Sequence, residues 1–323
     1  MWNEKLKIID KEKTPLLAAN LWGKVDNLQL VNEGINLVYC YIQGTEKYYL
    51  RLTHAKLRSH EELQAALAYQ MHLFENDAPV CEPIKSTNNL WFESIWQGED
   101  EFLAHVCKEV PGEPIRFDYS DFNIYKNWGH ALGKLHRAAG SYKLGIHNYA
   151  IWSASLDELD DYVKNETIEV KHTLQKVSQY LKSRPQTSIN YGLTHGDHRE
   201  GNVLTDGKQV NIIDFDLPSL NWYTEDLFRP FFDSIVSDKK NWQDKINPYL
   251  EGYFKIMPEA AIDLNAFPWQ IQMKCLEIYL WTKHNWSDKT APGGNDKKLW
   301  LLDIYQKIVR IDWSDRLKIV CHG

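Results

Sequence analysis

The stretch that decides the fold is residues 194–216, THGDHREGNVLTDGKQVNIIDFD. Two short apolar runs within it, 202–205 and 209–214, flank Asp206-Gly207, a dipeptide typical of tight hairpin turns. The spacing therefore predicts a β-hairpin. Because the two ends of a hairpin are adjacent, residues placed just before its first strand and at the end of its second should be neighbours.

Three side chains with oxygen atoms stand around this hairpin: Asn202 at the start of one strand, Asp214 at the end of its partner, and Asp197 five residues before Asn202. If they converge, the group suits phosphoryl transfer. One Asp can orient an acceptor hydroxyl and take its proton, while an Asn and a second Asp supply the hard oxygen ligands that Mg²⁺ prefers. The alternative is a chance H-G-D-x-x-x-x-N pattern with a turn Asp and a strand cap, and the joint spacing argues against it.

The segment resembles the catalytic and metal-binding loops of the aminoglycoside phosphotransferase and choline-kinase-like family, a relative of the eukaryotic protein kinases. The resemblance covers most of the chain, because Gly129–His136 (GHALGKLH) is similar to the family's G-x-x-L-G-x-L-H helix and Tyr223–Leu227 (YTEDL) to its W/Y-x-x-D-L segment. It implies that Asp197 is the catalytic base, that Asn202 and Asp214 bind Mg²⁺, and that ATP or GTP is the phosphate donor.

The same resemblance assigns roles to three neighbouring residues. Asp216 is implied as a secondary metal ligand or a brace, and His195 as a structural residue that holds the catalytic loop. Arg199 lies two residues after Asp197, where protein kinases carry a Lys. Two interpretations of Arg199 stay open: it reaches the γ-phosphate and stabilises developing charge, or it is a solvent-exposed loop residue.

The expected fold class is α+β: a bilobal, protein-kinase-like fold. A small β-rich N-terminal lobe over residues 1–110 would bind the nucleotide, and a larger, mostly helical lobe over 111–323 would carry catalysis and the acceptor. The boundary is placed at 110–114 (VPGEP), because Pro and Gly interrupt regular structure there.

Periodicity gives a coarse plan of the elements. Strands are expected within 28–42, at 47–53, near 90–96 and within 101–110. Helices are expected at 59–76, 124–139, 156–181, 267–285 and 298–311. The 59–76 helix should begin with a capping box, since Ser59 is followed three residues later by Glu62.

The N-terminal lobe departs from the family pattern twice. The third-strand Lys is Arg51, and the position of the C-helix Glu is Ala66. Leu50 and Leu52 flank Arg51, so strand alternation places Arg51 on the opposite face. Glu62 lies one turn before Ala66 and has two open roles: a pair with Arg51, or the capping box alone.

The resemblance also implies the remaining nucleotide contacts. The covering loop would be residues 32–38 (NEGINLV), with a single glycine, Gly34, and with Asn36. One glycine is a weak phosphate-cradle signal by itself. The hinge that contacts adenine through its backbone would be Cys107, Lys108, Glu109 and Val110.

Composition excludes several classes of protein. The 323 residues carry 37 basic and 44 acidic side chains, a net charge of −7, which argues against a nucleic-acid partner. No apolar window is long enough to span a membrane, and no membrane partner is expected. Five cysteines without a C-x-x-C motif argue against a disulfide framework and favour a cytoplasmic location.

The resemblance implies an O-phosphotransferase that acts on a hydroxyl of a small molecule, an antibiotic of amicoumacin or aminoglycoside type. Residues 48–70 resemble the bacterial branch with the amicoumacin kinases and the stress-response Ser/Thr kinase. The alternatives are a Ser/Thr protein kinase, a metabolite kinase of homoserine or choline type, and a nucleotide-binding pseudokinase.

The acceptor would be a cationic or amphipathic hydroxylated antibiotic. An acidic chain suits a cation. Six of the 13 tryptophans, from Trp242 to Trp313, lie in the helical region well beyond the catalytic segment; core packing explains most of them, but some could line an apolar pocket floor. Candidates by position are Glu225, Asp226, Asp233, Trp281 and Trp286, with Asp226 also expected to brace the fold.

Overall fold

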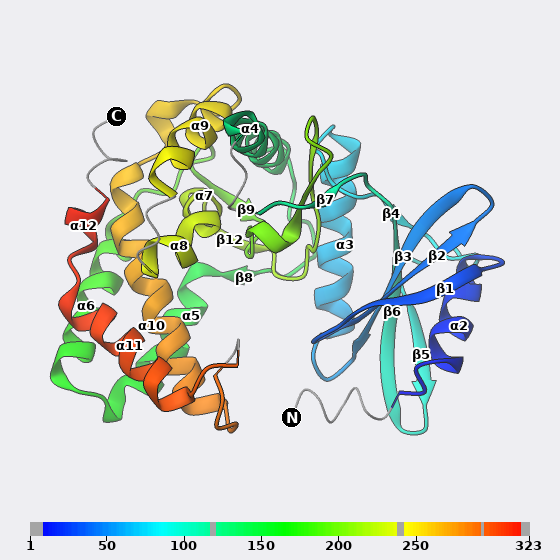
Figure 1. Cartoon of the computed structure of the whole chain (residues 1–323), viewed down its shortest axis with the longest axis horizontal. Coiled ribbons are helices and arrows are strands. Elements are labelled where there is room, and N and C mark those ends of the chain that lie inside the picture. The colour runs from blue at the N-terminus through cyan, green and yellow to red at the C-terminus, as the bar shows by residue number, and fades with distance from the viewer. Residues whose placement is uncertain (1–8, 117–120, 238–241, 292–293, 318–323) are drawn as a thin grey trace. The chain divides into compact units, whose positions relative to one another are not determined.

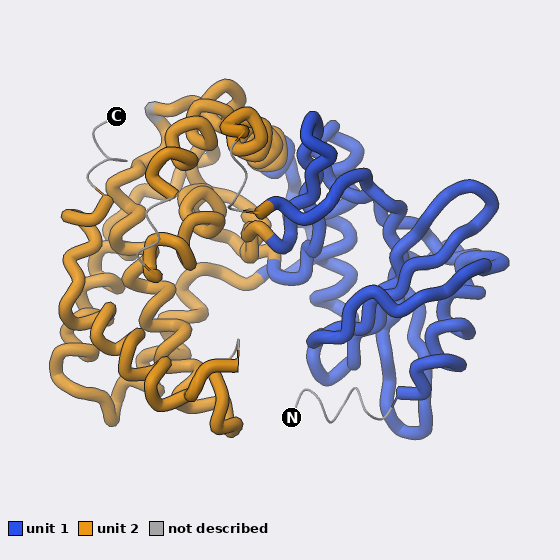
Figure 2. Tube along the Cα trace, in the orientation of Figure 1, with its two compact units in different colours: residues 1–115, 137–149, 201–217 blue, residues 116–136, 150–200, 218–323 orange. Residues whose placement is uncertain are grey.

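The computed structural model describes residues 9–116, 121–237, 242–291 and 294–317 (Figure 1). The chain forms two compact units (Figure 2). Unit 1 comprises residues 1–115, 137–149 and 201–217, and unit 2 comprises 116–136, 150–200 and 218–323. The units are therefore not two continuous halves of the chain, and the segment that carries Asn202 and Asp214 belongs to unit 1.

The main sheet of unit 1 is antiparallel throughout. Its order is β1 (Asp26–Glu33), β2 (Leu37–Gln43), β3 (Glu46–His54), β6 (Asp100–Lys108) and β4 (Pro83–Ile84), and β5 (Glu93–Gln97) pairs with the first part of β6. Each strand-forming stretch expected from the sequence contains one or two of these strands. β4 was not expected, because two residues give no alternation to read.

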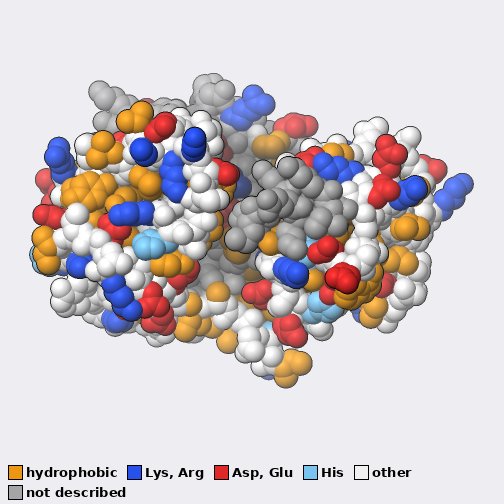
Figure 3. Space-filling view, turned by 90° about the horizontal axis from the view of Figure 1, so that it is seen from below, with side chains coloured by type: hydrophobic (Ala, Val, Ile, Leu, Met, Phe, Trp, Pro, Cys, Tyr) orange, Lys and Arg blue, Asp and Glu red, His pale blue; other side chains and the backbone are white. Residues whose placement is uncertain are grey.

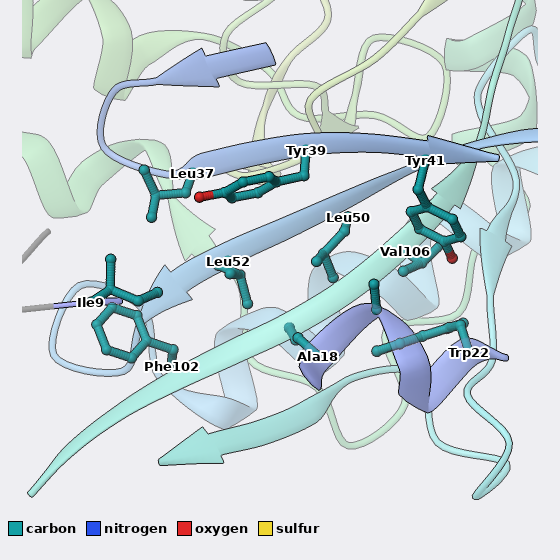
Figure 4. Close-up of a cluster of buried hydrophobic side chains, with 12 residues drawn as sticks. Ile9, Ala18, Trp22, Leu37, Tyr39, Tyr41, Leu50, Leu52, Phe102 and Val106 are labelled. Carbon is teal, nitrogen blue, oxygen red and sulfur yellow. The ribbon is translucent and has the colours of Figure 1, made fainter. Parts of the chain in front are cut away.

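The core of unit 1 lies on one face of this sheet (Figure 4). Leu50 and Leu52 of β3 are fully buried there against helix α2 (Lys13–Ala19) and Trp22. Arg51 stands between the two leucines in sequence, so the strand period of two places it on the opposite face of the sheet. The alternation thus delivers a cation to the other face of the sheet.

Helix α3 (His60–Glu75) begins with the expected capping box. The Ser59 hydroxyl accepts a hydrogen bond from the Glu62 amide at 3.2 Å, and the Glu62 carboxylate accepts one from the Ser59 amide at 2.8 Å. Leu63 packs on Leu103 of β6. The prediction of the helix and of its first residue is confirmed.

The expected hairpin is also present in unit 1. It consists of β10 (Val203–Thr205) and β11 (Val210–Ile212), extended by β7 (Glu113–Pro114). Gly207 occupies the turn with a φ of +88°, a conformation that an L side chain rarely adopts. The Ile212 amide donates to the Pro79 carbonyl at 2.7 Å, which ties the hairpin to the rest of unit 1.

Unit 2 is mostly helical and holds one small sheet of β8 (Ala150–Ile151), β12 (Ser219–Trp222) and β9 (Tyr191–Thr194). Its longer helices are α5 (Trp152–Tyr162), α6 (Ile168–Ser183), α9 (Gln243–Phe254), α10 (Phe267–Asn285) and α11 (Lys297–Arg310). The short ones are α7 (Thr224–Phe228), α8 (Phe232–Val236) and α12 (Trp313–Arg316). Helix α4 (Phe122–Ala139) contributes residues to both units. The helices expected at 124–139, 267–285 and 298–311 are confirmed.

Short 3₁₀ segments connect these elements. They are η1 (Asn20–Trp22), η2 (Val163–Asn165), η3 (Glu200–Asn202), η4 (Arg229–Phe231), η6 (Glu259–Ala261) and η7 (Leu264–Ala266).

The single helix expected at 156–181 is wrong: α5 and α6 replace it. After η2 the backbone of Glu166 is extended, and its buried carboxylate accepts hydrogen bonds from Lys283 at 2.5 Å and Tyr279 at 3.2 Å, both on α10. A buried carboxylate needs such partners, and a continuous helix would not present Glu166 in this way. The break is therefore decided by a residue more than a hundred positions away.

The first glycine of the G-x-x-L-G pattern, Gly129, serves close helix packing. A Cβ on Gly129 of α4 would collide with the Tyr249 carbonyl of α9, and a Cβ on Gly252 of α9 would collide with the Lys126 carbonyl of α4. The two helices thus approach each other through backbone at two reciprocal points. This contact explains why glycine is needed in the first helix of unit 2.

The surface drawn in Figure 3 mixes basic, acidic and apolar side chains without separating the two signs of charge. In the part of the chain that the structure describes, no helix combines the length and the apolar character that crossing a membrane requires. The described cysteines, Cys40, Cys81, Cys107 and Cys275, are free thiols.

Candidate active site

A buried carboxylate fixes the loop that follows β9. Asp226 of α7 accepts hydrogen bonds from the amides of His195 at 2.6 Å and Gly196 at 3.0 Å. Gly196 has a φ of +83°, so the chain turns sharply here and only glycine does so without strain. Asp197 follows directly, and its position is thereby set by a residue of a different element. The expected bracing role of Asp226 is confirmed.

Asp226 is itself held by a buried imidazole. His136 lies 3.0 Å from Asp226 through Nε2 and 2.9 Å from the Tyr253 hydroxyl through Nδ1. Burial lowers the pKa of His136, so the ring is neutral, and its partners assign the proton to Nε2. Burial alone would raise the pKa of Asp226, but the hydrogen bond from His136 and the electrostatic effects of the neighbouring histidines, His195 and His198 among them, together outweigh burial and lower that pKa. Asp226 is therefore an ionised acceptor at neutral pH.

Each carboxylate oxygen of Asp197 accepts a hydrogen bond from an arginine guanidinium. Arg229 of η4 donates from Nη2 to Oδ1 at 3.0 Å, and Arg199 donates from Nε to Oδ2 at 2.9 Å. Burial by itself would raise the pKa of Asp197, but the charge of Arg229 and the hydrogen bond from Arg199 outweigh burial and lower the pKa. The carboxylate is thus ionised, and its side chain is 26% exposed and open to a reactant.

Arg229 is a residue that sequence reasoning missed, since nothing in the local pattern ties it to Asp197. The Arg199 side chain is 47% exposed and paired with Asp197, which agrees with its reading as an exposed loop residue. The phosphate contact remains a prediction.

At the base of the hairpin in unit 1, Asn202 and Asp214 are brought together as expected. The amide of Ile213 donates to the Asn202 carbonyl at 2.9 Å, which places Asp214 next to Asn202. Asp214 has a φ of +71°, a left-handed conformation that Asp tolerates better than most residues and that is common at functional sites. Asp197 belongs to unit 2, so its convergence with these two residues stays a prediction.

Arg51 binds two carboxylates on the face opposite the core. Its Nη1 lies 2.8 Å from Asp214 Oδ1, and its Nη2 lies 2.8 Å from Asp216 Oδ2. The pair with Glu62 weighed above is wrong for the described residues: the Glu62 carboxylate accepts the Ser59 amide in the capping box, and Arg51 is taken by the aspartates. Glu62 therefore loses the basis for a nucleotide-binding role.

Asp216 has further partners that the sequence did not indicate. Arg58 donates from Nη1 to Asp216 Oδ1 at 2.8 Å, and Asn36 donates from Nδ2 to Asp216 Oδ2 at 2.9 Å. Thr53 in turn donates its hydroxyl hydrogen to Asn36 Oδ1 at 2.6 Å. Asn36 and Thr53 are buried, so the loop between β1 and β2 is tied to the same cluster.

The other residues expected to contact nucleotide have local roles in unit 1. Gly34 donates its amide to the Asn36 carbonyl at 3.1 Å and is not among the glycines with positive φ. In the expected hinge, the Lys108 amide donates to Glu82 and the Glu109 amide to Lys47, both at 2.9 Å. Those two amides are engaged within the unit, and the contact of Cys107–Val110 with an adenine remains a prediction.

The oxygen donors at the hairpin base fit a hard divalent cation. The side chains of Asn202 and Asp214 offer an amide oxygen and a carboxylate. Among the described residues no group of three or more His, Cys, Asp or Glu is gathered that could enclose a metal by itself. Two protein ligands that leave positions for water and phosphate oxygens are what Mg²⁺ commonly takes.

The candidates for the acceptor site are three acidic side chains and two tryptophans. Burial raises the pKa of Glu225 to about 7, and Lys274 opposes that rise. Trp281 and Trp286 lie with ring centroids 6.3 Å apart. Asp226 is hydrogen-bonded to the H-G-D loop, and Asp233 lies on α8.

A clamped aspartate in an H-G-D loop and a sheet cation bound to the aspartates of a D-F-D segment define a class, the kinase-like phosphotransferases. The chain belongs to the phosphotransferase enzyme family, whose model matches residues 28–251. The expected bilobal, kinase-like fold class and the expected enzyme class are thereby confirmed.

Known relatives agree with this assignment. The chain is 29% identical to amicoumacin kinase of Bacillus subtilis (strain 168) over 309 residues, which cover 91% of this chain and 90% of that protein. It is 23% identical to homoserine kinase of Neisseria meningitidis serogroup B (strain ATCC BAA-335 / MC58) over 278 residues, 84% of this chain and 88% of that protein.

Among solved structures, an amicoumacin kinase in complex with AMP-PNP, Ca²⁺ and Ami superimposes with a TM-score of 0.79. The match has 19% sequence identity and covers 98% of this chain and 96% of that one, so it shows the fold.

Proposed function

We propose that the chain is an ATP- or GTP-dependent O-phosphotransferase that phosphorylates a hydroxyl of a small-molecule antibiotic of amicoumacin or aminoglycoside type. The observation that carries the proposal is Asp197: an ionised, partly exposed carboxylate held in a loop that Asp226 fixes. The relationship to amicoumacin kinase supports the substrate class.

Asp197 acts as the base in this proposal. It accepts a hydrogen bond from the acceptor hydroxyl and so directs the oxygen at the γ-phosphorus. As the new O–P bond forms, the bond from that phosphorus to the β–γ bridging oxygen breaks and its electron pair leaves with the nucleoside diphosphate. The hydroxyl proton passes to Asp197. Arg199 can exchange Asp197 for a phosphate oxygen, because its side chain is half-exposed.

The nucleotide phosphates are proposed to lie against unit 1. Arg51 supplies a positive charge, and the loop with Gly34 and Asn36 covers the phosphates. Asn202 and Asp214 would hold Mg²⁺, which when bound neutralises phosphate charge. The segment Cys107–Val110 would contact the adenine or guanine base.

The acceptor is proposed to be cationic or amphipathic. The net charge of −7 favours a cation, and the Trp281–Trp286 pair offers an apolar surface. We propose no nucleic-acid or membrane partner and a cytoplasmic location.

One assay separates this proposal from its alternatives. The purified chain, Mg²⁺ and labelled ATP or GTP are offered amicoumacin-type and aminoglycoside antibiotics, homoserine, choline and a generic protein. Transfer to antibiotics alone supports the proposal, whereas transfer only to metabolites or only to protein supports a metabolite or a protein kinase. Nucleotide binding without any transfer supports a pseudokinase.

The matched variants are Asp197→Ala and Asp157→Ala, the second an exposed acid on α5. Asp197→Ala should abolish transfer and leave nucleotide affinity and thermal stability near the wild-type values, and Asp157→Ala should change none of the three. Turnover retained by Asp197→Ala would falsify the assignment of the base.

A further inference from the structure

Kinase-like enzymes need an anion that holds the phosphate-binding cation of the third strand, and here the C-helix position for it is Ala66, which is buried. We propose that Asp216 takes that role: it is the positioning residue that directs Arg51 toward the nucleotide. The proposal rests on the nucleotide binding assumed above. It assigns Asp216 to Arg51 instead of to a metal ion.

The first step is the division of Arg51 between two carboxylates. One terminal nitrogen binds Asp214 and the other binds Asp216, each at 2.8 Å. Asp214 is the proposed metal ligand, so a bound cation would compete with Arg51 for it. Asp216 is then the partner that Arg51 keeps. A planar guanidinium held at one nitrogen by a fixed carboxylate has a defined orientation.

The second step is that Asp216 is fixed independently of Arg51. Its Oδ1 accepts from Arg58, whose guanidinium is nearly buried, and its Oδ2 accepts from Asn36 as well as from Arg51. Thr53 locks the Asn36 amide from β3, two residues along the strand from Arg51 and on the same face. One carboxylate thus joins β3, the covering loop and the segment after β11.

The third step concerns the lone pairs of the Asp216 carboxylate that remain free for a metal ion. A carboxylate has about four lone-pair sites, and three are occupied by Arg51, Arg58 and Asn36. A metal ion would find about one free lone pair on Asp216 and would have to accept two neighbouring cations, Arg51 and Arg58. The electrostatics therefore favour an anchor for arginine over a secondary metal ligand.

The charges of the cluster balance in pairs. Arg51 and Arg58 face Asp214 and Asp216, so two positive charges meet two negative ones. If Asp214 binds a cation, the two guanidinium groups of Arg51 and Arg58 share the single charge of Asp216. One positive charge is then not neutralised within the cluster and can attract a phosphate group. Glu62 of α3 stays in its capping box and takes no part in holding Arg51.

The experiment is a double-mutant cycle on nucleotide affinity, measured calorimetrically on the full chain with ADP in EDTA and again with Mg²⁺. The variants are Asp216→Asn, Arg51→Gln and both together, with the exposed Glu99→Gln as the matched control. Asp216→Asn should weaken ADP about tenfold in EDTA, the loss expected for one charge-assisted contact. In the Arg51→Gln background the same change should have almost no effect, and Glu99→Gln should have none.

The Mg²⁺ arm distinguishes the anchor from the metal ligand. An anchor leaves the fold-increase in affinity on adding Mg²⁺ unchanged in Asp216→Asn, whereas a ligand loses that increase. Additive losses in the cycle, or a lost Mg²⁺ effect, would overturn the proposal. If the wild type binds no nucleotide, the proposed function fails instead.

A second variant guards against a misfolded Asp216→Asn. Arg58→Gln reaches Arg51 through Asp216, so it should weaken ADP in the same direction and should also lose its effect in the Arg51→Gln background. Unchanged affinity in Arg58→Gln, with an unchanged melting temperature, counts against the anchor.

Discussion

Arg229 donates a hydrogen bond to Asp197 across 3.0 Å although the two residues are separated by 32 positions in the chain. Its remaining nitrogens, Nε and Nη1, are buried without a hydrogen-bond partner among the residues that the structure describes. The guanidinium is therefore directed by Asp197 and, in return, stabilises the charged form of that carboxylate. Arg229 therefore helps to set both the protonation state and the orientation of Asp197, the proposed base.

Arg229→Gln should move the acid limb of the kcat/KM profile to higher pH. Arg229 lowers the pKa of Asp197, and a lowered pKa keeps the carboxylate ionised until the pH falls through that value. Removing the charge lets the pKa rise, so activity is lost earlier on acidification. Arg199→Gln should shift the limb less, because its exposed charge is screened by water. Equal limbs in all three proteins would refute this account.

Asp226→Asn should destabilise the fold by about 3 kcal/mol at neutral pH, the cost of leaving buried partners of a charge unpaired. The Asp226 pKa is lowered to about 2, so its contribution is present above its unfolded pKa of about 4 and is lost as the pH falls toward 2. Urea unfolding at pH 7 and at the lowest workable pH measures this. A gap between wild type and variant that does not narrow on acidification would contradict the assignment.

His198→Gln should flatten the pH dependence of stability below pH 6.5. Burial lowers the pKa of His198 to about 3, while an unfolded His titrates near 6.5, so between these values only the unfolded chain takes up the proton. The free energy of unfolding therefore decreases as the pH is lowered, by up to about 1.4 kcal/mol per pH unit for this group. Gln can still accept the Trp128 indole hydrogen. The exposed His172→Gln is the control, and an unaltered slope in His198→Gln would exclude the linkage.

Gly129→Ala should lower the melting temperature, with a cost of about 1–3 kcal/mol or more, because its methyl group meets the Tyr249 carbonyl of α9. Gly34→Ala is the matched change: its Cβ would find only the Asn32 side chain at 3.8 Å, and its φ is not positive. Calorimetry should show a near wild-type transition for Gly34→Ala. Equal transitions for both variants would mean that α4 and α9 do not approach so closely.

Local signals account for the elements that sequence reading recovered. The hairpin follows from Asp206-Gly207 between apolar runs, and α3 follows from Ser59 with Glu62, because in each case the deciding hydrogen bonds join residues within a few positions. The break between α5 and α6 is not predictable from local sequence, because Glu166 is held by hydrogen bonds from Lys283 and Tyr279. Both partners lie more than a hundred positions away along the chain.

The candidate site divides in the same way. Asn202 and Asp214 could be placed together because a two-stranded hairpin fixes which residues meet at its base. Arg51 could be placed on the face away from the core, because alternation along a strand is local. The partner of Arg51 could not be identified from the sequence. Glu62, one helical turn before Ala66, suggested the wrong partner.

By itself, the sequence determined the chemical groups of the site, the hairpin that carries two of them and the family to which they point. Only the tertiary structure decided the partners: Asp214 for Arg51, 163 positions away, Arg229 for Asp197, and Asp226 for the catalytic loop. The physical reason is that an ion pair forms where packing brings two charges within about 3 Å with their hydrogen-bonding geometry satisfied. That distance is set by the whole fold, and composition, spacing and periodicity carry no record of it.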